Sequence, residues 1–68
     1  MESDWVKIYE AGDVVKIELA SQTLKNFSLE VVVMNKKDSL YGFGEYELYV
    51  KRDQVIHAKK ILKDFDFK

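Results

Sequence analysis

The chain has 68 residues, of which 47% are hydrophobic and 34% charged, and its formal net charge is −1. A chain of this length and composition is typical of one globular domain, residues 1–68, which is too small to enclose a large substrate pocket beside its core. The near-zero net charge argues against recruitment of nucleic acid or an anionic membrane by a long-range field. The absence of cysteine excludes disulfides, thiolate metal sites and cysteine catalysis.

The N-terminus and the apolar runs predict the compartment. Acidic residues stand at the N-terminus, where a signal peptide needs a basic region followed by an apolar one. The longest apolar run, Val31–Met34, is far too short to cross a membrane. We therefore expect a cytoplasmic protein with no membrane partner.

The first predicted element is a half-buried strand over residues 5–9, because its side chains alternate with period two. The alternation predicts Val6 and Ile8 on the core side. The other three residues would lie on the opposite face: Trp5, Lys7 and Tyr9.

The period then becomes helical from Val14 to about Asn26, with Asp13 as the expected N-cap. Apolar residues at spacings of three and four form one stripe along this helix. The stripe consists of Val14, Ile17, Ala20, Leu24 and Phe27. Ser28 would make the turn after the helix.

Two further strands are predicted, at residues 29–34 and 46–50. The first is rich in β-branched residues, which favour strands. Its alternation predicts Leu29, Val31 and Val33 on one face, and on the other face Glu30, Val32 and Met34. In the second strand the residues expected to point inward are Tyr46, Leu48 and Val50.

A second helix follows, for which Asp53 is either the N-cap or a favourable first-turn charge. Its apolar face consists of Val55, Ala58, Ile61, Leu62 and Phe65. Residues 65–67 are a candidate for a short fourth strand.

The order β-α-β-β-α predicts an α+β fold in which both amphipathic helices cover one side of a three-stranded sheet. The second and third strands would form an antiparallel hairpin. The first strand either pairs with the third, which gives the order 1-3-2 of a ferredoxin-like sandwich, or pairs in parallel with the second. We favour 1-3-2 because all pairs are then antiparallel. The outer edge of the first strand would be open, to be covered by the 65–67 tail or by a second molecule.

The stretch 35–45, NKKDSLYGFGE, is the long interruption between two strand patterns and a candidate contact loop. Its glycines and nearby cations could cradle an anion, although the spacing is not that of a P-loop. The alternatives are a partner-binding loop and a plain hairpin connection. The candidate contact residues are Lys36, Lys37, Ser39, Tyr41 and Phe43.

The face of the sheet turned away from the helices is a second candidate. Its expected apolar residues are Trp5, Tyr9, Val32, Met34 and Tyr49. Exposed apolar patches usually mark interfaces, so we expect a homodimer or a protein partner here, the alternative being ordinary half-exposed sheet surface. Aromatic residues on an open sheet also suit nucleic acid. However, three carboxylates are expected on this face with Lys7 as its only cation, which argues against phosphate: Glu30, Glu45 and Glu47.

No catalytic constellation is visible in the sequence. The one histidine, His57, lies off the apolar stripe of its helix, and a single histidine without matched carboxylates rarely binds metal. No serine, threonine or lysine has a histidine base beside it in sequence. We therefore expect no metal, no cofactor and no enzymatic activity.

Several segments resemble a family. These segments are WVKIYEAGD before a helix, then LEVVVMN, then GEYELYV before a helix with Ala58. Together they resemble a bacterial family of domains of unknown function described as prokaryotic signal-transducing proteins. The resemblance covers roughly residues 4–64. It implies a ferredoxin-like fold related in topology to nitrogen-regulatory PII proteins, whose signalling loop also joins strands two and three. It brings no catalytic residues, and many members have glycine where Ser28 stands.

Three functions remain open at this point. The first is a small cytosolic regulatory module that binds a protein or small ligand through the 35–45 loop and the outer sheet face. The second is an enzyme or metabolite-binding subunit whose pocket forms only on oligomerisation, with Lys36, Lys37 or Ser39 in a cleft between subunits. The third is a purely structural domain. The sequence predicts neither the ligand nor the pathway.

Overall fold

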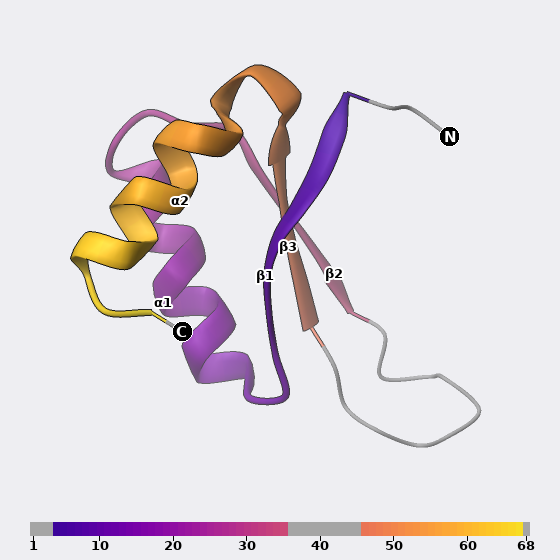
Figure 1. Cartoon of the computed structure of the whole chain (residues 1–68). Coiled ribbons are helices and arrows are strands. Elements are labelled where there is room, and N and C mark those ends of the chain that lie inside the picture. Colours follow the sequence, from indigo (N-terminus) through magenta and orange to yellow (C-terminus); the bar gives the residue numbers. More distant parts are fainter. Residues whose placement is uncertain (1–3, 36–45, 68) are drawn as a thin grey trace.

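The computed structural model describes residues 4–35 and 46–67 of the chain (Figure 1). The predicted element order is confirmed: β1 (Trp5–Ala11), α1 (Val14–Lys25), β2 (Val31–Asn35), β3 (Tyr46–Lys51), a 3-10 turn η1 (Arg52–Gln54) and α2 (Val55–Asp64). The sheet has the order β1-β3-β2 and both strand pairs are antiparallel. The alternative parallel pairing of the first two strands is therefore wrong.

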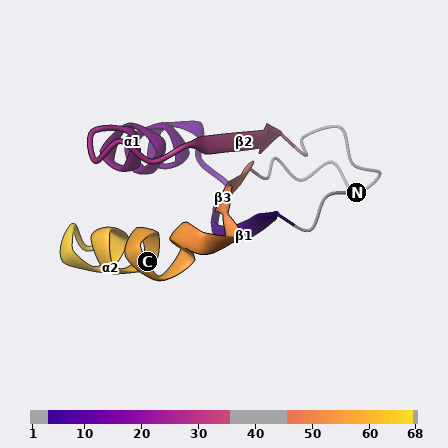
Figure 2. The ribbon, with the colours of Figure 1, turned by 90° about the horizontal axis from the view of Figure 1, so that it is seen from above.

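The molecule has two layers, with both helices on one face of the sheet (Figure 2). In that view α1 lies on the β2 side and α2 on the β1 side. The central strand β3 buries Leu48 and Val50 completely under the helices. The core is formed by the inner stripes of both helices, β3 and Leu29: Ile17, Ala20, Leu24, Leu29, Leu48, Val50, Ala58, Ile61 and Leu62.

Both ends of the predicted α1 stripe and the C-terminal end of the α2 stripe lie outside this core. Val14, Phe27 and Phe65 are exposed. Phe27 and Phe65 contact each other edge to face, with ring centroids 6.0 Å apart. The two residues follow the C-termini of α1 and α2, so they meet beyond the region where the helices pack on the sheet.

A β-bulge at Ile8 divides β1. Lys7 pairs with Tyr49 and Tyr9 with Leu48, so Ile8 has no partner of its own on β3. Successive side chains of a strand point to opposite faces. One extra residue therefore turns Tyr9 to the helix side, where it packs on the core and contacts Phe67 at a centroid distance of 5.7 Å. The prediction that Tyr9 lies on the outer face is wrong, because a bulge shifts the alternation by one residue.

Each helix is followed by a turn that contains a residue with positive φ. Ser28 has φ 68° and Asp66 has φ 66°. The next N–H in each case reaches back five residues: Leu29 donates to Leu24 O at 3.3 Å, and Phe67 donates to Leu62 O at 2.9 Å. This is the C-terminal closure in which glycine usually takes the left-handed position. The predicted turn at Ser28 is confirmed.

The same closure overturns the candidate fourth strand. Residues 65–67 are not extended, because the left-handed backbone of Asp66 reverses the chain after α2. The reversal brings Phe67 back onto Tyr9 instead of along the edge of β1.

The two predicted N-caps differ in outcome. Asp13 caps α1 as predicted, since its Oδ1 accepts a 2.8 Å hydrogen bond from the N–H of Val15. Asp53 is not the N-cap of α2, because the 3-10 turn η1 intervenes and Gln54 occupies that position. Asp53 lies in η1, and the first turn of α2 contains no acidic residue, so the alternative prediction of a first-turn charge on the second helix is wrong as well.

Candidate functional site

The outer face of the sheet carries a cluster of apolar side chains that line a shallow hollow of about 290 Å³. Four of the five residues predicted for this face are in it, and they are here called the outer patch: Trp5, Val32, Met34 and Tyr49. Val32 and Met34 are 38% and 44% exposed. The helices cover the opposite face, so no described element lies over the outer patch (Figure 2).

Strand register explains why these side chains meet. Val32 of β2 lies directly opposite Tyr49 of the central strand. Trp5 of β1 is paired with Lys51, two residues from Tyr49 on the same face of β3. All three strands therefore contribute to the outer patch, and directly opposed side chains in a sheet are close enough to pack.

One border of the outer patch is a network of ionic and hydrogen bonds. The Lys7 ammonium lies 2.8 Å from Glu10 Oε1 and 3.4 Å from Glu47 Oε2. The Tyr49 hydroxyl donates to Glu47 Oε1 at 2.8 Å. The hydrogen bond to Glu10, supported by the charge of Glu47, raises the pKa of Lys7. The hydrogen bond to the Glu47 carboxylate raises the pKa of Tyr49, and desolvation acts in the same direction.

Lys51 forms the border near Trp5. Its Nζ lies 5.3 Å from the centroid of the Trp5 ring, within the range of a cation–π interaction. The same ammonium lies 4.0 Å from Glu30 Oε1. Lys51 is therefore a second cation on this face, whereas the sequence predicted Lys7 as the only one. Lys51 belongs to the end of β3 opposite Trp5, whereas the predicted strand ended one residue earlier, at Val50. Glu45 lies outside the described residues.

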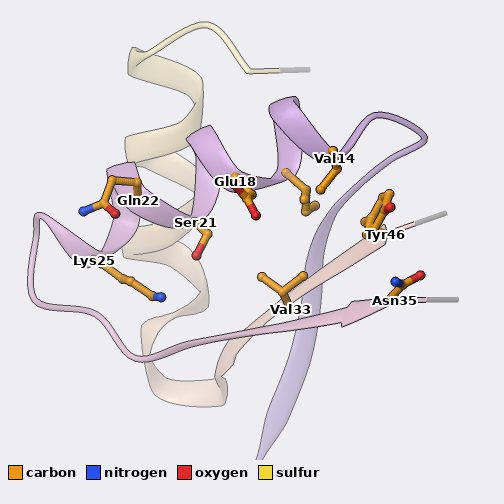
Figure 3. A pocket seen from close by; sticks show the side chains of 9 residues that line it. Val14, Glu18, Ser21, Gln22, Lys25, Val33, Asn35 and Tyr46 are labelled. Atoms are coloured by element: carbon orange, nitrogen blue, oxygen red, sulfur yellow. The ribbon is translucent and has the colours of Figure 1, made fainter. Parts of the chain in front are cut away.

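A second concave site lies between α1 and the β2 edge and is here called the α1–β2 groove (Figure 3). Its volume is about 440 Å³. It is lined by Val14, Ile17, Glu18, Ser21, Gln22, Lys25, Val33, Asn35 and Tyr46. Glu18 and Ser21 project from α1 toward Val33, and Tyr46 and Asn35 lie at the far end from Lys25 (Figure 3). This groove was not predicted from the sequence. The one sequence feature that points to it is Ser21, a serine next to Ala20 of the apolar stripe, which is buried in the structure.

The five loop residues predicted as contacts cannot be placed with these two sites. Lys36, Lys37, Ser39, Tyr41 and Phe43 lie outside the described residues. The strands that the loop connects end and begin at Asn35 and Tyr46, next to Met34 of the outer patch. The loop contacts therefore stay predictions.

Further observations concern the described part of the chain, residues 4–35 and 46–67. No group of three or more histidine, cysteine, aspartate and glutamate residues in it is arranged to hold a metal ion. Neither of its helices is long and apolar enough to cross a bilayer. His57 is exposed, and its ring lies 6.5 Å from that of Phe27, in contact with the aromatic pair at the helix ends.

Comparison with family models gives no match, and the searches of curated proteins and of solved structures find no similar protein. The resemblance to signal-transducing domains therefore stays a prediction. Function has to be inferred from the geometry of the outer patch and of the α1–β2 groove.

Proposed function

We propose that this chain is a small cytosolic regulatory module that binds a protein partner through the outer patch. One observation carries the proposal: four large side chains from three strands form an apolar surface with no described element over it. Tryptophan, tyrosine and methionine are enriched in the buried centres of protein interfaces. Trp5, Met34 and Tyr49 are therefore suited to be anchors in such a centre.

The shape of the outer patch favours a protein over a small ligand. Small-molecule sites are usually deep enough to bury most of the ligand, and a few polar groups fix its orientation. The outer patch is a hollow formed by only four side chains on an open sheet face. The Tyr49 hydroxyl, a polar group of this lining, is already bonded to Glu47. An apolar side chain of a partner fits this hollow better than a polar metabolite.

The charges around the outer patch favour a partner without a strong charge of its own. Lys7 is paired with Glu10 and Glu47, and Lys51 is paired with Glu30. These internal pairs leave little net field above the patch, so association would be driven by apolar burial rather than by steering. We expect the affinity to change little between low and physiological salt.

Regulation through complex formation agrees with the resemblance to signal-transducing domains. The 35–45 loop connects β2 and β3 at the Met34 end of the outer patch, so it is a candidate second contact.

The experiment compares two double variants in affinity capture with quantitative mass spectrometry, followed by titration calorimetry with the purified partner. Trp5→Thr/Tyr49→Thr removes two anchors while keeping residues that favour strands. Val15→Gln/Leu19→Gln is the matched control, because these α1 residues are 60% and 56% exposed. We expect the first variant to lose the partner and the control to retain it, with both folded by circular dichroism. Retention of the partner by the Trp5/Tyr49 variant would exclude the proposal.

The α1–β2 groove supports a second candidate, a metabolite-binding subunit. Its lining combines the Ser21 hydroxyl with the charges of Glu18 and Lys25 (Figure 3), a set that suits a small zwitterion. Amide-shift titration with amino acids, nucleotides and small anions tests this. Saturable shifts at Ser21 and Val33 would favour the groove. If no residue shifts, this candidate is excluded for the compounds tested.

A further inference from the structure

We infer that β2 pairs antiparallel with β2 of a second copy of this chain, in a two-fold symmetric dimer with one continuous sheet of six strands, three from each copy. The inference concerns the edge of the sheet rather than its outer face, so it stands independently of the partner proposed above.

The two edges of the sheet differ in their protection. Proteins protect edge strands from pairing with other chains by bulges and by charged side chains. The β1 edge has both, since Ile8 is a bulge and Lys7 and Glu10 are charged. The β2 edge has neither: Val31–Asn35 contains no charged residue and no proline, and it keeps an unbroken register with β3. Among the described strands, β2 is the edge that is suited to accept another strand.

Symmetry favours a second copy over a foreign peptide. A two-fold axis through Val33, the centre of the five-residue strand, sets Val33 opposite its own equivalent and Val32 opposite Met34. Both partners in each pair then lie on the same face of the sheet, as strand pairing requires. Because β2 carries no charge, self-pairing brings no like charges together. A two-fold axis through another residue of β2 would also keep paired side chains on the same face of the sheet, but it would leave part of the strand unpaired.

The charges along the groove are complementary under the same symmetry. Glu18 and Lys25 line the β2 side of α1, about two turns apart. A two-fold axis perpendicular to the sheet runs the two α1 helices antiparallel. The Glu18 carboxylate of one copy then approaches the Lys25 ammonium of the other, and the reverse contact is equivalent. Complementary charges of this kind fix the register of an interface.

The dimer would also enlarge the outer patch. Val32 and Met34 belong both to β2 and to the outer patch. Their pairing across the axis joins the patches of the two copies into one apolar surface on the face opposite the helices.

The test is a charge exchange at Val33, which is 41% exposed. Sedimentation equilibrium should give the wild type twice the chain mass of 8.0 kDa. Val33→Lys and Val33→Glu, each alone, should raise the dimer dissociation constant severalfold, because like charges then face each other across the axis. An equimolar mixture of the two variants should regain the dimer, since opposite charges meet.

Folding is checked by amide spectra of each variant, and the Trp5→Thr/Tyr49→Thr variant should remain dimeric because it leaves β2 intact. The inference is overturned by a wild type that is monomeric at millimolar concentration. It is also overturned if Val33→Lys dimerises as the wild type does, or if the mixed variants stay monomeric. A monomer whose β2 amides shift only on addition of an extended peptide would assign the edge to a peptide instead.

Discussion

The hydroxyl of Tyr49 donates a hydrogen bond of 2.8 Å to the carboxylate of Glu47, two residues earlier on the same face of β3. Lys7, directly opposite Tyr49 on β1, lies 3.4 Å from the other oxygen of that carboxylate. The carboxylate thus connects a phenol at the centre of the outer patch to a cation at its border. This arrangement makes the protonation of Tyr49 a measure of the state of the outer face.

The first prediction concerns pH. The bond to Glu47 raises the pKa of Tyr49 above its ordinary 10.0. A group whose pKa is raised in the folded state stabilises the fold fully at pH values below its unfolded-state pKa. This stabilisation is lost as the pH rises through the folded-state pKa. Absorbance titration of the tyrosinate, taken as the difference from Tyr49→Phe, should therefore show a midpoint above that of a free tyrosine.

Two variants should shift this midpoint in opposite directions. Glu47→Gln removes the carboxylate and should lower the Tyr49 pKa, whereas Lys7→Gln removes a charge that lowers it and should raise the pKa further. Shifts of the same sign in both variants would contradict the network described here.

The second prediction concerns the contact between Tyr9 and Phe67, whose rings meet edge to face. Aromatic pairs contribute about 0.5–1.5 kcal/mol beyond their burial. A double-mutant cycle with Tyr9→Leu and Phe67→Leu, followed by urea unfolding, should give a coupling free energy in that range. The control is Phe65→Leu with Tyr9→Leu, for which we expect no coupling because Phe65 contacts Phe27 instead. Equal couplings in both cycles would argue against the bulge at Ile8, which turns Tyr9 inward.

Tyr9 also shows where sequence reasoning failed and why. Period-two alternation predicted the faces of β2 and β3 correctly, because neither of these strands contains an inserted residue. In β1 the inserted residue, Ile8, and the residue after it, Tyr9, are both apolar. The pattern therefore gave no sign of an inserted residue, and only pairing with Leu48 reveals it.

The α1–β2 groove could not be predicted for a different reason. Helical periodicity says which side of α1 faces the sheet, and it correctly selected Ile17, Ala20 and Leu24. It does not say how far the helix lies from the edge of the sheet. That offset depends on how both helices share the space above three strands, which is a property of the packed structure.

The third prediction concerns the helix ends. Ser28 and Asp66 hold the left-handed conformation, which costs non-glycine residues about 1–2 kcal/mol. Glycine has no such cost but loses more entropy on folding. Ser28→Gly and Asp66→Gly should each raise the free energy of unfolding by about 0.5–1 kcal/mol, measured by urea titration. Ser21→Gly, the same substitution inside α1, should instead destabilise the protein. Destabilisation by Ser28→Gly would show that this C-terminal closure is assigned wrongly.

The fourth prediction uses the single tryptophan of the chain as a reporter of the proposed interface. Trp5 lies in the outer patch, half-buried, with the Lys51 ammonium 5.3 Å from its ring. A partner that covers the patch excludes water from the indole. Binding should therefore shift the emission to the blue and reduce quenching by iodide. Gln22→Ala in the α1–β2 groove should leave both changes intact, whereas Met34→Gln in the patch should reduce them. Tight binding of the partner with Trp5 still fully quenchable would place the contact elsewhere on the molecule.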